Sequence, residues 1–216
     1  MSFQHSTKKL SQILFVLIAM LVVAASASAQ SSAAASREYK RLLKLSNDLK
    51  KIPFDRYDKE PHRTFLKRND KDIVYSEPAG QWFVRSGRFW DLYKKYAKLP
   101  IADDIAWSAA DNPLPGECEG YVNCYMYNIR VTYGEYLRLF PNGKHSKKAV
   151  DRIVEYQQYM ADDEYTNYEG PGDDAAERSD LKKMITELRD ILTKASPESK
   201  TKALEQLAVI ESRFAR

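Results

Sequence analysis

The chain has 216 residues, of which 44% are hydrophobic and 30% charged, and its formal net charge at pH 7 is +4. These proportions are those of a globular protein with enough apolar side chains to build a core. The small net charge gives no overall electrostatic reason to expect binding to nucleic acid, and we expect no such partner.

The N-terminus has the layout of a secretory signal peptide. Lys8 and Lys9 precede an uninterrupted apolar run at residues 13–25, and the small residues at 27–29 provide a cleavage site. The apolar run is short for a membrane-spanning helix, which needs about 20 residues. An uncleaved membrane anchor is the alternative interpretation.

Three segments follow from this pattern. We expect residues 1–29 to be a signal peptide, residues 30–36 to be a flexible lead-in rich in Ser and Ala, and residues 37–216 to form a single domain. The mature protein would be periplasmic or secreted. It would meet the membrane only through the signal segment before cleavage.

The first part of the domain combines one clear helix with irregular structure. Apolar residues at helical spacing, from Tyr39 to Leu49, predict a helix that ends near Pro53. Charges and breaks dominate residues 54–72, where we expect only a short helix near 63–67. Two brief apolar runs then flank Glu-Pro-Ala-Gly, a pattern that permits one short β-hairpin near residues 73–84.

Two pairs of helices follow, each interrupted by a proline. In residues 87–110, an aromatic stripe leads to Pro100 and then to an alanine-rich helix that begins with two adjacent aspartates. In residues 121–160, Pro141 and the following Asn-Gly separate two helical stripes. The stripes consist of Met126, Ile129, Tyr133, Tyr136, Leu137 and Phe140, and of Ala149, Ile153, Tyr156 and Met160. Helices joined by so short a break should pack antiparallel.

The C-terminal part predicts a third helical pair behind an acidic loop. Residues 162–174 could bind calcium through clustered oxygens, but they lack the alternating acids and the central glycine of an EF-hand loop. A solvated loop is the favoured interpretation. Beyond it, apolar spacing predicts a helix over 181–192, and Ser196-Pro197 predicts the cap and first turn of a last helix ending near Phe214.

The order of aromatic helix, proline and alanine-bearing helix occurs twice, with the two prolines 41 residues apart. This arrangement, and the sequence Ala-Asp-Asp-Ile-Ala-Trp at 102–107, resembles uncharacterised exported bacterial tetratricopeptide-like (TPR-like) proteins. The resemblance covers about half of the mature chain. It implies an all-α stack of antiparallel helical hairpins over residues 37–216, an α-solenoid, and it identifies no catalytic residues. An ordinary helical hairpin is the alternative interpretation.

The two cysteines, Cys118 and Cys124, predict a structural disulfide in an exported protein. On one continuous helix, residues six apart are separated by about 9 Å, which exceeds the roughly 7 Å that a disulfide allows between Cα atoms. Cys118 must therefore precede the helix and fold back through Glu119-Gly120. A redox Cys-x-x-Cys pair is excluded by the spacing, and a zinc site is disfavoured because the histidines are distant in sequence.

No residue set in the chain identifies a reaction. The adjacent acids Asp103 and Asp104 are typical of a helix start rather than of a catalytic pair, and no hydrolase or metalloprotease motif occurs. Most of the 14 tyrosines fall at core positions. Aromatic residues off the stripes are candidates for an exposed binding surface: Trp82, Tyr121, Tyr125, Tyr165 and Tyr168.

We therefore expect a protein that is not an enzyme, needs no cofactor or metal, and serves in the cell envelope as a scaffold for a protein or peptide partner. The alternative is a cell-wall glycan binder or glycan-processing enzyme that uses exposed aromatics and the acidic loop. The oligomeric state stays open.

Overall fold

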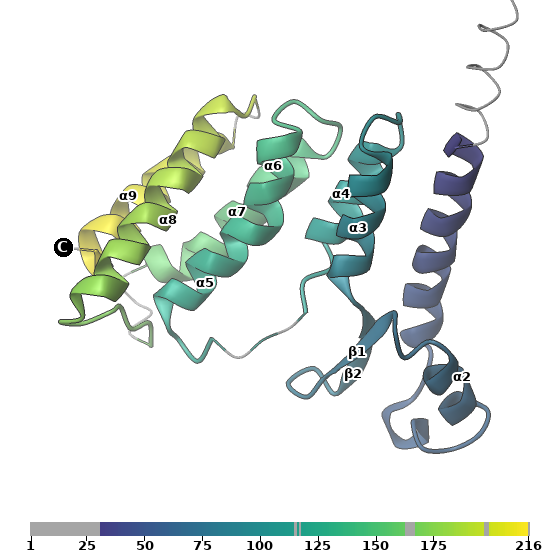
Figure 1. The fold of residues 1–216 in the computed structure, drawn as a ribbon. Coiled ribbons are helices and arrows are strands. Elements are labelled where there is room, and N and C mark those ends of the chain that lie inside the picture. The colour runs from purple at the N-terminus through teal and green to yellow at the C-terminus, as the bar shows by residue number, and fades with distance from the viewer. Residues whose placement is uncertain (1–30, 115, 117, 163–166, 197–198, 216) are drawn as a thin grey trace, which may run out of the picture.

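The computed structural model describes residues 31–114, 116, 118–162, 167–196 and 199–215. This part of the chain is mainly α-helical and contains one two-stranded antiparallel sheet (Figure 1). The predicted signal peptide lies outside the described residues. No described helix combines the length and apolar character needed to cross a bilayer.

The helices stand side by side in a row (Figure 1). The helix of residues 31–49 lies at one end, followed by the pair α3 (Ser86–Tyr96) and α4 (Ala102–Ala110). The central pair consists of α5 (Val122–Ile129), η2 (Arg130–Gly134) and α6 (Glu135–Leu139) on one side and α7 (Ser146–Ala161) on the other. The last pair, α8 (Ala175–Lys194) and α9 (Lys200–Phe214), packs on α5 and α7 respectively.

The N-terminal end of the row has its own core. Leu42, Leu45 and Leu49 of the first helix pack with Phe89 and Ile105 of the α3–α4 pair. Residues 31–36, expected to be a flexible lead-in, belong instead to the helix, and Ala35 is fully buried. The prediction failed because alanine, which also suits a mobile tether, is the strongest helix former.

Short elements complete this end. A 3-10 turn, η1 (Phe54–Arg56), precedes α2 (His62–Arg68), which matches the short helix predicted near 63–67. The predicted β-hairpin is confirmed: β1 (Ile73–Ser76) pairs with β2 (Gln81–Val84) in the register Ile73 to Val84.

The central pair contributes about half of the second core, ten of its 21 described buried residues. The predicted stripe is buried at Met126, Ile129, Tyr133, Tyr136 and Leu137. It is interrupted by η2, a π-helical turn, which the spacing did not predict. Within this turn, the hydroxyl of Thr132 donates to the carbonyl oxygen of Asn128, 2.6 Å away. Side-chain bonds of this kind to the preceding turn are common where a helix departs from α geometry.

The last pair closes the second core through Leu181, Ile185, Leu188, Leu207 and Ile210. Asp174 caps α8, because its carboxylate accepts hydrogen bonds from the backbone N–H groups of Ala176 and Glu177. The prediction that Ser196 caps the last helix was wrong, and Pro197, predicted in its first turn, lies outside the described residues. The helix begins at Lys200, and the Ser196 hydroxyl instead bonds the side chain of Asn142.

Candidate functional site

The disulfide fastens one end of the central pair. Cys118 and Cys124 are bonded with their Cα atoms 5.5 Å apart, and Cys118 precedes α5, as predicted. The chain folds back through Glu119 and Gly120, whose φ angles are +47° and +86°. A Cβ at Gly120 would lie 2.2 Å from the carbonyl oxygen of Asn167, so only glycine fits there.

This close approach joins two segments that are distant in sequence. The backbone N–H of Val122 donates to the oxygen of Glu169, and the N–H of Glu169 donates to the oxygen of Gly120, both at 2.9 Å. The bonds form an isolated parallel bridge between Tyr121 and Glu169. They hold Tyr168 beside α5, where its ring centroid lies 5.4 Å from that of Tyr125.

Next to this junction lies a hollow that we call the tyrosine groove. It consists of two cavities of about 400 and 350 Å³ that share Tyr125, Tyr133 and Tyr156 in their walls. The first cavity is further lined by Asp111, Arg152, Glu155, Tyr159 and Tyr168. The second is further lined by Ser86, Pro113, Leu114, Gly116, Cys118, Asn128, Ile129, Val131 and Thr132.

Different elements place the rings. Tyr125 comes from α5, Tyr133 from the π-helical turn η2, and Tyr156 and Tyr159 from α7. Tyr133 is almost fully buried and forms the floor, with its ring centroid 5.9 Å from that of Tyr156. Tyr156 and Tyr159 are exposed, at 38% and 43%.

The phenols of Tyr133 and Tyr156 are neutral at pH 7. Burial raises the pKa of Tyr133, and the neighbouring Tyr156 and Asp111 raise it further. Burial also raises the pKa of Tyr156. At neutral pH the rings therefore offer uncharged aromatic faces and hydroxyl groups for hydrogen bonding.

One arginine forms ion pairs with both of the carboxylates that line the first cavity. Arg152 Nη1 lies 2.8 Å from Glu155 Oε2, and its Nε lies 3.7 Å from Asp111 Oδ1. The hydroxyl of Tyr133 also reaches Asp111 Oδ1, at 3.5 Å. Both acids therefore serve as ion-pair partners of Arg152.

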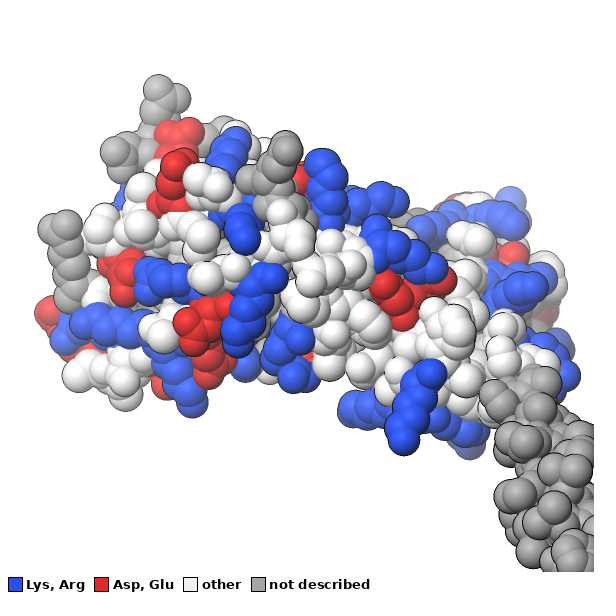
Figure 2. Space-filling model, turned by 90° about the horizontal axis from the view of Figure 1, so that it is seen from above, with Lys and Arg blue, Asp and Glu red and all other residues white. Residues whose placement is uncertain are grey.

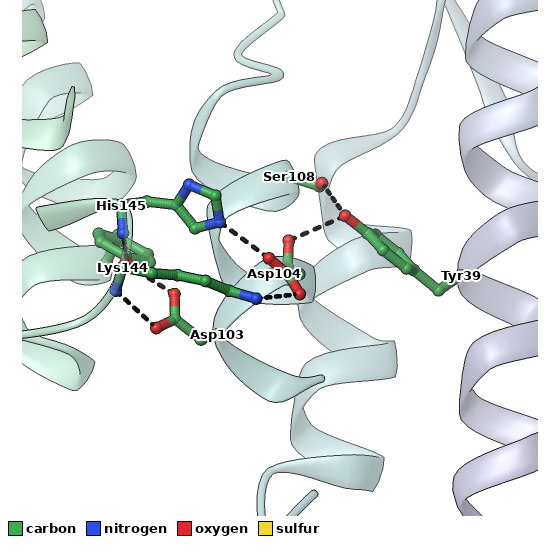
Figure 3. A network of polar contacts seen from close by, with 7 residues as sticks. Tyr39, Asp103, Asp104, Ser108, Lys144 and His145 are labelled. Carbon is green, nitrogen blue, oxygen red and sulfur yellow. Dashed lines mark hydrogen bonds and ion pairs between the residues drawn. The ribbon is translucent and has the colours of Figure 1, made fainter. Parts of the chain in front are cut away.

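A second polar cluster lies at the opposite end of the central pair (Figure 3). His145 Nε2 and Lys144 Nζ lie 2.9 and 2.5 Å from the two carboxylate oxygens of Asp104. Asp103 accepts from the Tyr136 hydroxyl at 2.6 Å and from the backbone N–H of Lys144 at 3.0 Å. Each of these side chains has a partner within the protein, which is typical of a structural joint.

Burial would raise the pKa of Asp104, but the hydrogen bonds and charges of Lys144 and His145 outweigh it, and the pKa lies below its usual value. The ring of His145 stacks on Trp107 with centroids 5.2 Å apart. On the other side of α4, the Tyr39 hydroxyl donates to the Asp104 carbonyl oxygen and lies 2.8 Å from Ser108 Oγ (Figure 3). The cluster therefore connects three layers of the helical row.

The predicted binding aromatics are only partly brought together. Tyr125 and Tyr168 line the groove, whereas Tyr121 lines a separate polar cavity of about 400 Å³ between α5 and α8. Its hydroxyl bonds the carboxylate of Glu177, which raises the pKa of Tyr121 to about 12. Trp82 packs on Tyr57 and Tyr75 near the β-hairpin. These four are partly buried rather than exposed, and Tyr165 lies outside the described residues.

Sequence reasoning missed the most informative residues of the groove. Tyr133 and Tyr156 lie on the helical stripes that predicted core positions, and Tyr156 is exposed. Asp111 and Arg152 are 41 positions apart and carried no signal. Only the fold, which brings the end of α4 beside α7, places them together.

Among the described residues, no group of three or more His, Cys, Asp and Glu side chains could hold a metal ion. Comparisons with known proteins identify no relative: no family model matches the chain, no curated protein matches it, and no solved structure does. The function must therefore be argued from the groove itself.

Proposed function

We propose that this protein is an exported, non-enzymatic binding protein that holds an extended peptide segment of another envelope protein in the tyrosine groove. The observation that carries the proposal is the pair of adjoining cavities that share Tyr125, Tyr133 and Tyr156. Tyrosine rings suit such a surface because they provide contact area and hydrogen-bonding groups with little loss of conformational entropy.

Two further observations support the compartment and the architecture. A disulfide persists in oxidising compartments such as the periplasm or the exterior, in agreement with the signal-peptide pattern at residues 1–29. Helical pairs in a row are the architecture of TPR-like solenoids, whose extended surfaces bind peptides. We include a TPR-like arrangement in the proposal.

Panning a library of displayed random peptides on the exported, purified chain tests this function. We expect enriched peptides whose affinity falls at least ~10-fold in Tyr156→Ala, since exposed aromatics at the centre of a site dominate binding. Tyr127→Ala is the matched control, because Tyr127 is an exposed tyrosine, 52% accessible, that does not line the groove.

Loss of affinity in both variants, or in neither, would contradict the proposal. A chito-oligosaccharide probe tests the glycan alternative in the same assay. If the sugar binds in a manner that depends on Tyr156 and no peptide does, the protein is a glycan binder.

A further inference from the structure

Acidic residues outnumber basic ones in the two segments beside the tyrosine groove. Residues 111–129 contain three Asp and Glu and no Lys, Arg or His, and residues 167–177 contain four acids and again no basic residue. These two segments meet at the bridge between Tyr121 and Glu169. They provide Asp111, Tyr125 and Tyr168 to the wall of the first cavity.

The other end of the molecule has the opposite charge. Residues 31–100 contain 17 Lys and Arg against nine Asp and Glu. On the face seen in Figure 2, Lys and Arg side chains are spread along the whole row, and Asp and Glu side chains are less frequent toward the end that carries the first helix. One residue of this basic part, Ser86, lines the second cavity. Charge in solution acts over roughly 8 to 10 Å, so a ligand in the first cavity experiences mainly the charges that line it, Asp111, Glu155 and Arg152.

The lining of the groove favours cations as well. Tyrosine rings attract an ammonium or guanidinium group placed over their faces, and five tyrosines line the first cavity. Among the described residues that line the two cavities, Arg152 is the one basic residue, and its charge is offset by the two carboxylates that it contacts, Asp111 and Glu155. The side chain of Glu155 is 60% exposed and can accept a second cation from a ligand.

We infer that the segment held in the tyrosine groove is a basic peptide, with Lys or Arg side chains placed over the tyrosine rings and near Glu155. This inference rests on the proposed peptide-binding function and adds the chemical class of its ligand. Rim charges of this kind contribute mainly to selectivity and to the rate of association.

Three labelled heptapeptides, in which glycine alternates with lysine, glutamine or glutamate, test the inference by fluorescence anisotropy on the full exported chain. We expect the lysine peptide to bind ~10-fold more tightly than the glutamine peptide at low salt, and the glutamate peptide to bind most weakly. The preference for lysine should decrease as salt rises. Tyr156→Ala should weaken the lysine and glutamine peptides together.

Glu155→Gln should weaken the lysine peptide about three- to fivefold and leave the glutamine peptide unchanged. Glu135→Gln is the matched control. It removes the same charge and also breaks an ion pair to an arginine three positions away, Arg138, outside the groove. An equal effect of both substitutions would show that only the net charge matters, and would overturn the inference.

The failures are distinguishable. If the three peptides bind equally and all depend on Tyr156, the peptide-binding function stands and the basic ligand is wrong. If no peptide binding depends on Tyr156, both are wrong. The basic residues 31–100 of a second copy are another possible occupant. Sedimentation velocity at the assay concentration measures self-association of the chain. If the chain self-associates and Glu155→Gln abolishes this, the ligand of the groove is a second copy and not a peptide.

Discussion

The two ends of the central helical pair are fastened in different ways. At the Pro141 turn, side-chain hydrogen bonds from Tyr136, Lys144 and His145 converge on Asp103 and Asp104 of the neighbouring helix. At the start of α5, a disulfide joins Cys118 to Cys124, and two backbone hydrogen bonds hold the chain to Glu169. At the Pro141 turn the polar side chains are all bonded to one another, whereas the start of α5 borders a cavity.

This difference separates a structural joint from a binding site more clearly than residue type does. The joint contains Asp, Lys, His and Tyr, the residue types of many catalytic sites, yet Gly143 shows how little space remains in it. A Cβ at Gly143 would lie 2.7 Å from both the Asp103 carboxylate and the Tyr136 hydroxyl. The groove has less conspicuous residues but has room for a ligand.

The largest effect is expected from a backbone change at the start of α5, which we call the open end of the central pair because it borders the groove. Gly120→Ala should lower the free energy of unfolding by about 3 to 4 kcal/mol, because the new Cβ meets the Asn167 oxygen and the positive φ disfavours L residues. Urea unfolding followed by circular dichroism measures it. The control is Gly172→Ala, where φ is +53° and no atom lies within 4 Å of the Cβ; we expect about 1 kcal/mol there. Equal losses would contradict the close approach.

Local periodicity explains which parts of this fold could be predicted. The helices of the central pair, and the position of Cys118 ahead of α5, follow from spacing and from the reach of a disulfide. These are properties of neighbouring residues. The β-hairpin near residues 73–84 also depends only on a short segment and was correctly expected.

The groove could not be predicted because it depends on contacts between distant segments. Spacing shows that Tyr133 and Tyr156 share a face with apolar residues, but it cannot show that this face ends beside Asp111 and Tyr168. The π-helical turn has no periodic signal in the sequence. The helix at residues 31–36 was missed for a different reason. Alanine suits both a mobile tether and a helix, and the burial of Ala35 in the tertiary structure, which the local sequence does not show, stabilises the helix.

Removing the disulfide tests the open end with a smaller change. Cys118→Ser combined with Cys124→Ser releases a loop of about seven residues, for which chain entropy suggests a loss of roughly 2 kcal/mol. The double variant should stay helical, and its midpoint of thermal unfolding should fall by several degrees. Amide exchange should increase first at residues 118–127 and remain slow at residues 146–153, near the Pro141 turn. Equal acceleration at both ends would show that the two fastenings depend on each other.

The smallest effect is expected at the Pro141 turn, the closed end of the central pair, and it depends on pH. The pKa of Asp104 lies below its ordinary value of 3.8 because hydrogen bonds and charges from Lys144 and His145 outweigh the effect of burial. A lowered pKa in the folded state means that the ionised carboxylate stabilises the fold above about pH 3.8, and that this stabilisation is lost as the pH falls through the folded-state pKa. Asp104→Asn should therefore lower the free energy of unfolding by about 1 kcal/mol at neutral pH, the amount expected for charge-assisted hydrogen bonds that are partly exposed to solvent.

The difference between this variant and the unchanged protein should decrease below pH 3.8, and urea unfolding at a series of pH values measures it. Asp91→Asn provides the control, since Asp91 is 66% exposed and its contact with Lys94 spans 3.9 Å. An exposed pair of this kind contributes almost nothing to stability, so its substitution should leave the free energy of unfolding unchanged at every pH. A difference for Asp104→Asn that persists undiminished in acid would mean that the side chain acts through its shape and neutral hydrogen bonds. In that case the ion pairs of Figure 3 would not be what fastens the closed end.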